Sequence, residues 1–323
     1  MQMKAAILHG LNDIRCEMTE APVALQGEVG IRIAASGICG SDVDRVFGKG
    51  AYHYPIILGH EFSGYRDGDN KKVVAFPLLP CMECGMCQIG EFASCSNYDY
   101  YGSRRDGGFA EYISVKEWNV IEAPDEADME ALAMTEPAAV ALHAVSMLGI
   151  LPGYTVLVTG AGPIGMLLGQ WAAMSGACRV YFTDIDKRKL DFAVDHGFHV
   201  YNGETVDCAV EGTGFSQPLS QVLGAVGPRG TAVLMGNPSG DIHLTQKEYW
   251  HILRKQLTLR GTWNSMFNRF RDEWRVTVDT IASGRIDVKS LISHKFSLDE
   301  CNAAFDVLKK REEFVNRVMF LNK

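Results

Sequence analysis

The sequence predicts an α/β plus β-rich protein: a β-rich domain formed by residues 1–133 and 267–323, and a doubly wound parallel-sheet domain inserted at 134–266. Three observations lead to this prediction. The first third is rich in glycine and holds short apolar runs such as VGIRIAASG and KKVVAFPLL, which are typical of strands. From about residue 134, apolar strands alternate with helices. After QLTLRGTW this alternation stops.

Length, composition and charge exclude several classes of protein. The chain has 323 residues with 47% hydrophobic content, enough for two globular domains. Its formal charge of −8 argues against a large nucleic-acid interface. No apolar run reaches the roughly 18 residues of a membrane span, and the start MQMKAAILHGLND lacks the long apolar core of a secretory signal. We therefore expect a cytoplasmic protein with no nucleic-acid or membrane partner.

The inserted region consists of repeated strand–helix units. TVLVTG and RVYFTD have the composition of strands, whereas PIGMLLGQWAAMSGA and KRKLDFAVDHG have that of helices. Strands that alternate with helices of this length form βαβ units with right-handed crossovers. Beyond this region we expect a long helix over about residues 269–283.

A glycine-rich loop joins the first strand of this region to its helix. GAGPIG has the spacing G-x-G-x-x-G. The first glycine permits a tight turn, the second lets a pyrophosphate approach the backbone, and the third lets the helix pack on the strand. A plain strand–helix turn is the alternative, but the flanking strand and helix favour a dinucleotide. The predicted cofactor-binding residues here are Gly160, Gly162, Pro163, Ile164 and Gly165.

An acidic residue follows the second strand. Asp184 ends VYFTD, where a carboxylate would accept hydrogen bonds from the adenosine ribose. A carboxylate there would repel a 2′-phosphate, so NAD is favoured over NADP as the cofactor. Lys187 and Arg188 follow closely and keep NADP open, although they are also ordinary first-turn helix charges.

The densest cysteine cluster lies in residues 80–96. Its spacing is C-x2-C-x2-C-x7-C. Nine cysteines in a chain expected in a reducing compartment make a disulfide framework a poor fit. Bacterial ferredoxins instead follow C-x2-C-x2-C-x3-C-P. Four thiolates leave a tetrahedral ion no open position, so we predict a closed structural zinc site formed by Cys81, Cys84, Cys87 and Cys95.

A second set of metal-binding side chains is spread over three segments. SGICGSD contains Cys39 and Ser41, ILGHEFSG contains His60 and Glu61, and MTEPAAVALHA contains Glu136 near a helix start. One thiolate, one imidazole and one or two carboxylates suit zinc with an open fourth position. Each residue also has a plain structural explanation, and spacing does not by itself join the three segments.

The chain resembles the zinc-dependent medium-chain alcohol and polyol dehydrogenases. The motifs SGICGSD, GHEFSG, the four-cysteine lobe, DGGFAEY, TEPAAVALHA and GAGPIG occur in that family in this order. The resemblance covers almost the whole chain. YPIILGHEFSGY, PLLPC and GSRRDGGFAEYI are most similar to the branch of the family that acts on sugar-alcohol phosphates.

This resemblance implies a GroES-like catalytic domain interrupted by a Rossmann NAD-binding domain. Carried over by motif, Cys39, His60 and Glu136 would hold a catalytic zinc, while Glu61 would lie behind them or act as an alternate ligand. Ser41 would contact the substrate oxygen and begin a proton relay. Two zinc ions per chain, one catalytic and one structural, are therefore implied.

The implied reaction transfers hydride from a secondary alcohol of a polyol or polyol phosphate to NAD and gives a ketose. A dehydrogenase of unphosphorylated alcohols of the sorbitol or butanediol type would share every ligand. A non-catalytic NAD-binding zinc protein and an iron–sulfur electron carrier are alternatives from other classes. The resemblance also implies a homodimer or homotetramer.

Two features leave questions open. Classical members carry a relay histidine three residues beyond the serine, where this chain has Asp44. A phosphorylated substrate would need fixed cations, although surface ion pairs explain each arginine equally well. Those candidate arginines are Arg45, Arg104, Arg105 and Arg260.

Overall fold

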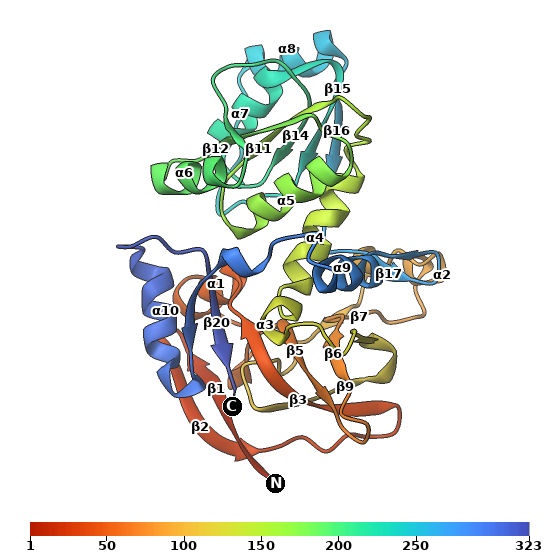
Figure 1. Cartoon of the computed structure of the whole chain (residues 1–323), viewed down its shortest axis with the longest axis vertical. Helices are drawn as coiled ribbons and strands as arrows, with labels where there is room; N and C mark the ends of the chain where they lie inside the picture. The colour runs from red at the N-terminus through yellow and green to blue at the C-terminus, as the bar shows by residue number, and fades with distance from the viewer. Residues whose placement is uncertain (323) are drawn as a thin grey trace. The chain divides into compact units, whose positions relative to one another are not determined.

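The computed structural model describes residues 1–322, and the chain divides into two compact units (Figure 1). The first unit contains Met1–Ala139 and Met266–Lys323, and the second contains Val140–Ser265. Helix α4 (Thr135–Ser146) crosses the division, and its Ala139 packs in a core cluster of the first unit. The second unit therefore begins six residues after the predicted bound of 134 and ends one residue before 266.

The first unit is built around a seven-stranded sheet. Its main path has the order β10-β6-β5-β3-β20-β19, and β9 also pairs with β3. Its strands are β3 (Glu28–Gly37), β5 (Glu61–Arg66), β6 (Lys72–Ala75), β9 (Tyr112–Lys116), β10 (Val120–Glu122), β19 (Ile292–Phe296) and β20 (Arg317–Leu321). The C-terminal strand β20 pairs antiparallel with β3, so residues from the two halves of the unit share one sheet.

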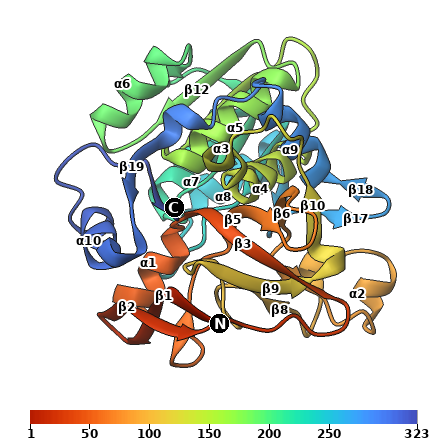
Figure 2. The ribbon, with the colours of Figure 1, turned by 60° about the horizontal axis from the view of Figure 1, so that its bottom comes forward.

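Smaller sheets complete the β structure of this unit. A three-stranded sheet has the order β2-β1-β4, and two further antiparallel sheets of two strands each pair β7 with β8 and β17 with β18. The bounds are β1 (Gln2–Gly10), β2 (Asp13–Glu20), β4 (Ile56–Ile57), β7 (Leu78–Leu79), β8 (Asp99–Tyr100), β17 (Phe267–Asn268) and β18 (Arg271–Asp272). Helix α10 contacts both β2 and β19, and Figure 2 shows it beside β19.

The helices of the first unit are short. They are α1 (Gly40–Phe47), α2 (Gly85–Gln88), α3 (Met129–Leu132), α9 (Glu273–Ala282) and α10 (Cys301–Lys310). The 3-10 turns are η1 (Phe92–Ser94), η2 (Glu117–Asn119), η3 (Lys289–Leu291) and η4 (Leu298–Glu300). The helix expected over 269–283 was predicted too long. Asp272 caps its first turn by accepting a hydrogen bond from the Arg275 amide, so the helix begins only at Glu273.

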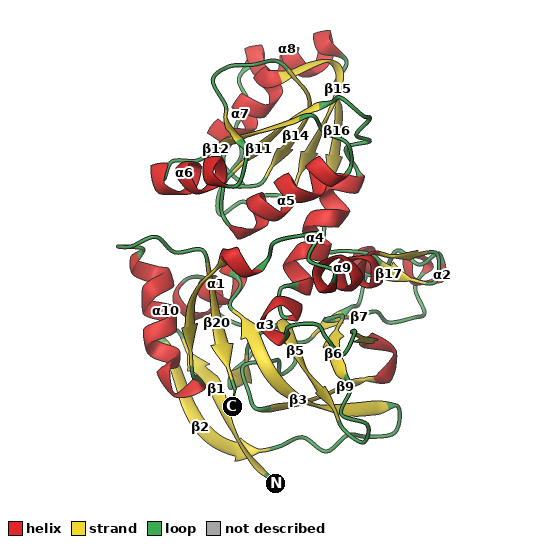
Figure 3. Ribbon diagram, in the orientation of Figure 1, coloured by secondary structure: helices red, strands yellow, loops and turns green. Residues whose placement is uncertain are grey.

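The second unit has one six-stranded parallel sheet with the order β13-β12-β11-β14-β15-β16. Its strands are β11 (Thr155–Thr159), β12 (Arg179–Thr183), β13 (His199–Val200), β14 (Val206–Glu211), β15 (Val226–Leu234) and β16 (Thr258–Gly261). Its further helices are α5 (Pro163–Met174), α6 (Lys187–Asp195), α7 (Ser216–Ala225) and α8 (Gln246–Lys255) (Figure 3). This is the order of the doubly wound dinucleotide-binding fold, and it reverses between β11 and β14.

The two units thus have the architectures that the sequence predicts, which confirms the fold class. Within residues 1–322, the structure contains no helix with both the length and the apolar character needed to cross a bilayer.

Candidate metal centres and active site

The four cysteines of residues 80–96 come together. Their sulfur atoms all lie within 4.8 Å of one another. Cys84 precedes α2, Cys87 lies within it, and Cys95 follows η1. Met82 adopts a left-handed backbone conformation, with φ of 63°, where the loop turns. The short helical turns therefore wrap the chain around one point, as the C-x2-C spacing predicts.

The chemistry of this cluster fits a cation. The amides of Cys87 and Ser96 donate to the Cys84 thiol and lower its pKa to about 6. Burial and the neighbouring sulfurs raise the pKa of Cys87 to about 12. The four sulfurs cannot all be thiolates unless a positive charge offsets their repulsion. A zinc ion supplies that charge and would take all four as ligands, so the four-cysteine cluster fits a structural zinc.

A second cluster contains Cys39, His60 and Glu61, whose ligand atoms also lie within 4.8 Å of one another. Cys39 directly precedes α1, and His60 directly precedes β5. Strands β3 and β5 pair antiparallel with Gly37 opposite Glu61, which brings the Cys39 segment to the start of β5. A side chain at position 37 would meet the end of the Glu61 side chain and displace its carboxylate.

This second cluster also fits a metal ion. Burial raises the pKa of Cys39 to about 11, and the charges of Glu61 and Asp42 add to that effect. A thiolate here therefore needs a nearby positive charge. A thiolate, an imidazole and a carboxylate form a donor set that zinc accepts with one position left open.

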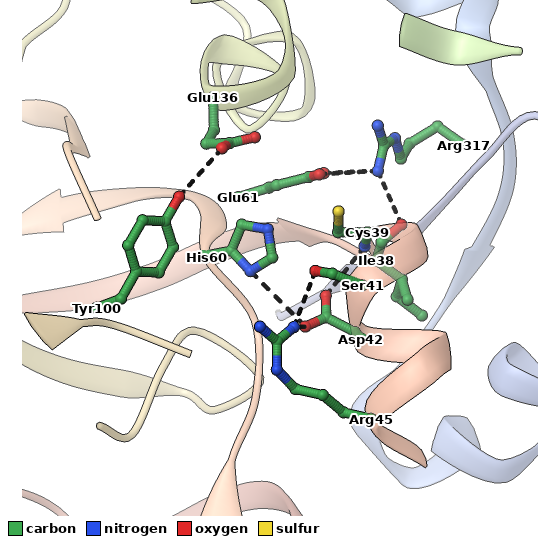
Figure 4. A network of polar contacts seen from close by, with 10 residues as sticks. All are labelled: Ile38, Cys39, Ser41, Asp42, Arg45, His60, Glu61, Tyr100, Glu136 and Arg317. Carbon is green, nitrogen blue, oxygen red and sulfur yellow. Dashed lines mark hydrogen bonds and ion pairs between the residues drawn. The ribbon is translucent and has the colours of Figure 1, made fainter. Parts of the chain in front are cut away.

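Asp42 organises the residues around this cluster (Figure 4). It is fully buried, and its Oδ2 accepts a hydrogen bond from the Cys39 amide at 3.0 Å. Its Oδ1 lies 3.7 Å from His60 Nδ1 and 3.5 Å from Arg45 Nη1. At 3.7 Å this carboxylate faces the His60 ring without a hydrogen bond. A carboxylate that does accept a hydrogen bond from a ligating histidine fixes the orientation of its ring. The motif gave no indication of this role for Asp42.

Arg317 is the second residue that the sequence did not reveal. Its Nη1 lies 2.9 Å from the Glu61 carboxylate and donates to the Ile38 carbonyl at 2.8 Å. Both side chains of the ion pair are at most 5% exposed. The available signal was an arginine within the otherwise apolar run VNRVMFL, because such a charge is buried only with a partner.

Glu136 lies in the first turn of α4 and outside the compact three-residue cluster. Its Oε1 accepts a hydrogen bond from the Tyr100 hydroxyl at 3.3 Å. The Tyr100 ring in turn meets His60 edge-on, with 5.7 Å between ring centroids. Burial raises the pKa of Glu136 to about 8. The structure thus places Glu136 beside the cluster, and its role as a zinc ligand stays a prediction.

Ser41 lies at the second position of α1 and is exposed. Its Oγ accepts a hydrogen bond from Arg45 Nη1 at 2.8 Å. Arginine keeps its protons under all ordinary conditions, so it can donate to Ser41 but cannot accept a proton from it. Asp44, at the position of the relay histidine in classical family members, is also exposed and lies 4.0 Å from Lys49.

In the second unit, the glycine loop has the conformation that its sequence predicts. Gly160 follows β11 with φ of +90°, a region that favours glycine. Gly162 caps α5, and Pro163 occupies its first turn. A side chain at Gly165 would collide with the Gly160 carbonyl. The amides at the start of α5 are therefore available to an anionic group such as a pyrophosphate.

Asp184 directly follows β12 and is fixed against this loop. Its Oδ2 accepts a hydrogen bond from the Ala161 amide and its Oδ1 from the Asp186 amide, each at 2.8 Å. Lys187 and Arg188, the two cations that left NADP as an alternative cofactor, each pair with an acidic residue. Lys187 pairs with Asp191 at 3.1 Å, and Arg188 pairs with Asp186 at 2.7 Å.

Known proteins share both parts of this chain. The family model for the alcohol dehydrogenase GroES-like domain matches residues 25–125, and that for zinc-binding dehydrogenases matches residues 163–283. Galactitol 1-phosphate 5-dehydrogenase of Escherichia coli (strain K12) is 36% identical over 85% of this chain and 87% of its own. Sorbitol dehydrogenase of Bacillus subtilis (strain 168) is 27% identical over 99% of this chain and 98% of its own.

The fold agrees with these relationships. The crystal structure of galactitol-1-phosphate dehydrogenase from Escherichia coli superimposes with a TM-score of 0.93 and 33% identity, covering 99% of this chain and 100% of that one. The predicted family is therefore confirmed. The chain belongs to the zinc-dependent medium-chain alcohol and polyol dehydrogenases, with a GroES-like part and a Rossmann part.

Proposed function

We propose that this protein oxidises a secondary alcohol of a polyol phosphate to a ketose, with NAD as hydride acceptor. The substrate we infer is galactitol 1-phosphate, which would give a tagatose 6-phosphate. The observation that carries this proposal is the cluster of Cys39, His60 and Glu61 in a chain 36% identical to a galactitol 1-phosphate 5-dehydrogenase.

Cys39 and His60 would hold the catalytic zinc, with Glu136 as the carboxylate ligand and Glu61 as the alternate. Of these two carboxylates, only that of Glu61 lies within the cluster, which supports Glu61 as the ligand. When bound, zinc supplies Lewis acidity, which lowers the pKa of a substrate hydroxyl. Asp42 would hold the His60 ring, and Arg317 would hold the Glu61 carboxylate.

The oxidation removes a hydride from carbon and a proton from the hydroxyl. Bound NAD would supply the acceptor for this hydride, because its nicotinamide ring is reduced as the alcohol becomes a ketone. Ser41 would accept the hydroxyl proton and pass its own proton to solvent. Arg45 cannot take that proton, because it already donates to Ser41 Oγ and has no acceptor atom. The exposure of Ser41 supports direct release to water.

The glycine loop and Asp184 would bind NAD. The amides at the start of α5 would face the pyrophosphate, and the Asp184 carboxylate would face the adenosine ribose. The acidic partners of Lys187 and Arg188 support NAD over NADP, because both cations already have a counter-charge. Cys81, Cys84, Cys87 and Cys95 would hold the structural zinc.

A dehydrogenase of an unphosphorylated polyol is the second candidate. The 27% identity to sorbitol dehydrogenase of Bacillus subtilis (strain 168) over nearly the full chain supports it. The metal and cofactor sites would be the same in both cases. The candidates differ only in what binds the far end of the substrate.

A substrate panel on protein of measured zinc content tests the proposal. Galactitol 1-phosphate, sorbitol 6-phosphate, galactitol, sorbitol and butanediol are each supplied with NAD, and NADH formation is followed. We expect the highest kcat/KM with galactitol 1-phosphate and a lower value with its unphosphorylated parent. A preference for free sorbitol or butanediol would establish the second candidate, and inactivity with every secondary alcohol would refute both.

A further inference from the structure

The structure separates the four arginines that the sequence offered as phosphate ligands. Arg104 donates to the Tyr98 carbonyl, and its guanidinium lies over the Tyr98 ring, 4.1 Å from the centroid. Arg105 pairs with Asp99, and Arg260 in the second unit donates to the Met147 carbonyl at 2.9 Å. Each of these three serves a contact within its own unit.

Arg45 differs from them because its guanidinium borders the candidate metal centre. It projects from α1, the helix that begins directly after Cys39. Its Nη1 donates to Ser41 Oγ at 2.8 Å and lies 3.5 Å from the Asp42 carboxylate, which is itself 3.7 Å from His60 Nδ1. Figure 4 shows the guanidinium next to Ser41 and Asp42, on the side away from Glu61 and Arg317.

Most of the hydrogen-bonding capacity of Arg45 is unused. A guanidinium carries five N–H donors in a planar fork. Within the described part of the chain, the partners of Arg45 are Ser41 and Asp42, and both are reached through Nη1. The other two nitrogens have no protein acceptor there. The side chain is 18% exposed, so it is held in place and still open to a ligand.

We propose that Arg45 binds the phosphate group of the substrate and so determines its specificity. This inference rests on the proposed polyol-phosphate function. The hydroxyl that reacts would lie beside Ser41, and the free edge of the Arg45 fork would face the far end of the same molecule. Two parallel N–H···O bonds from one guanidinium match the oxygens of a phosphate.

Local charges agree with this role. Asp42 lies nearest to Arg45, but it is fully buried and its Oδ2 is occupied by the Cys39 amide. Asp42 therefore holds the guanidinium through Nη1 and leaves its other two nitrogens without a contact to this carboxylate. Lys49, the next cation along the chain, lies 4.0 Å from Asp44 and is directed to that carboxylate. Arg45 is thus the cation among these residues that is free to meet an anion.

A purely structural role for Arg45 makes a different prediction. If the guanidinium served only to orient Ser41, its loss would slow the oxidation of every alcohol alike, through kcat. If it binds the phosphate, its loss raises KM for phosphate esters well beyond any effect that it has on the parent polyols. The ratio between an ester and its parent polyol therefore separates the two roles.

The experiment compares wild type with R45M, R45K and the control R105M, which removes an arginine of the neighbouring loop that pairs with Asp99. Kinetics are measured with galactitol 1-phosphate, galactitol and an aldonate of similar length. Binding is measured separately by titrating galactitol 1-phosphate into the NADH complex, in which no hydride can be transferred. The R45K variant retains the charge without the fork, so the test does not depend on R45M alone.

For R45M we expect the selectivity for galactitol 1-phosphate over galactitol to fall about 10- to 100-fold, mainly through KM, because hydrogen bonds to a charged group are lost. The Kd of galactitol 1-phosphate for the complex of the enzyme with NADH should rise by a similar factor. R45K should lose less, and R105M should match wild type. Equal losses for ester and parent polyol, or unchanged phosphate affinity, would overturn the proposal.

The selectivity of the wild-type enzyme for galactitol 1-phosphate over galactitol distinguishes failure of the role of Arg45 from failure of the proposed function. A wild-type enzyme without preference for any phosphate ester refutes the polyol-phosphate function itself. A wild-type preference that R45M keeps refutes only the role of Arg45. A preference for the aldonate that R45M abolishes would overturn phosphate as the ligand of this arginine.

Discussion

Arg317 and Glu61 form a buried ion pair, with 2.9 Å between guanidinium nitrogen and carboxylate oxygen, although 256 residues separate them in the sequence. The pair joins the C-terminal strand β20 to the start of β5. Because Glu61 also belongs to the metal-binding cluster, the last strand of the chain fixes one wall of the candidate active site. The integrity of the site therefore depends on the pairing of β20 with β3.

Breaking this pair should destabilise the protein strongly. In metal-free protein, R317M would leave the buried Glu61 carboxylate without its cation, which costs about 3–5 kcal/mol of unfolding free energy. The double variant E61Q/R317M should recover a large part of that loss, since no uncompensated charge remains. Urea unfolding measures the free energy of unfolding of both variants. R188M, which removes an exposed arginine paired with Asp186, should change stability by less than about 1 kcal/mol.

Removing a catalytic metal ligand should abolish turnover without unfolding the chain. C39S and H60A are expected to lose NAD reduction and to bind one zinc ion per chain where wild type binds two, since two clusters are present. Circular dichroism and metal analysis check these outcomes. C178S, at an exposed free cysteine, should keep both activity and zinc. Near-normal rates in C39S or H60A would show that the metal assignment is wrong.

Loss of a structural ligand should have the opposite profile. C84S is expected to bind one zinc ion per chain and to unfold about 5–10 °C below wild type, because the loop around α2 has little core of its own. At temperatures below the unfolding midpoint of C84S, its kcat should stay close to that of wild type. Thermal unfolding and kinetics on the same preparation give the comparison. An unchanged melting temperature would argue against a structural zinc in this cluster.

Asp184 should determine the choice of dinucleotide. D184S removes the carboxylate that would bind the ribose and repel a 2′-phosphate, and it frees the Ala161 amide. We expect kcat/KM with NAD to fall about 10- to 100-fold and the ratio of NAD to NADP activity to fall with it. D195N, at the exposed C-terminal end of α6, is the matched control. A D184S enzyme with an unaltered cofactor ratio would exclude this residue from the cofactor site.

Acid should weaken one surface cluster in a defined range of pH. The hydrogen bond from Arg66 lowers the pKa of Asp69 to about 2, from about 3.9 in an unfolded chain. A lowered pKa contributes stability that is present above pH 4 and lost as the pH falls towards 2. Chemical denaturation of wild type and D69N should therefore give curves that differ at pH 5 and converge near pH 2. Parallel curves over that range would contradict the assignment.

Local signals in the sequence predicted much of the fold. The glycine loop and the strand–helix alternation depend on neighbouring residues, so the six-stranded parallel sheet and the start of α5 at Pro163 were predictable. The four-cysteine cluster was predictable for the same reason, since fifteen residues contain it. The start of α9 was placed too early, because the hairpin β17–β18 takes up the residues before Asp272.

Contacts between distant segments could not be read in this way. The approach of Cys39 to His60 depends on the register of β3 and β5, which pairing across the sheet determines. Arg317 reaches Glu61 only because β20 pairs with β3. Motif order suggested the cysteine, histidine and carboxylates, but not that Tyr100 would hold Glu136 beside the cluster. Such partners become visible once the sheet order is known.

Removal and return of zinc show whether the enzyme depends on a catalytic metal ion. The protein is stripped of metal, its zinc content is measured, and NAD reduction with galactitol 1-phosphate is followed as zinc is added back. We expect no turnover without metal, and full activity once the Cys39, His60 and Glu61 centre is filled. Metal-free protein that oxidises galactitol 1-phosphate at the wild-type rate would contradict this expectation.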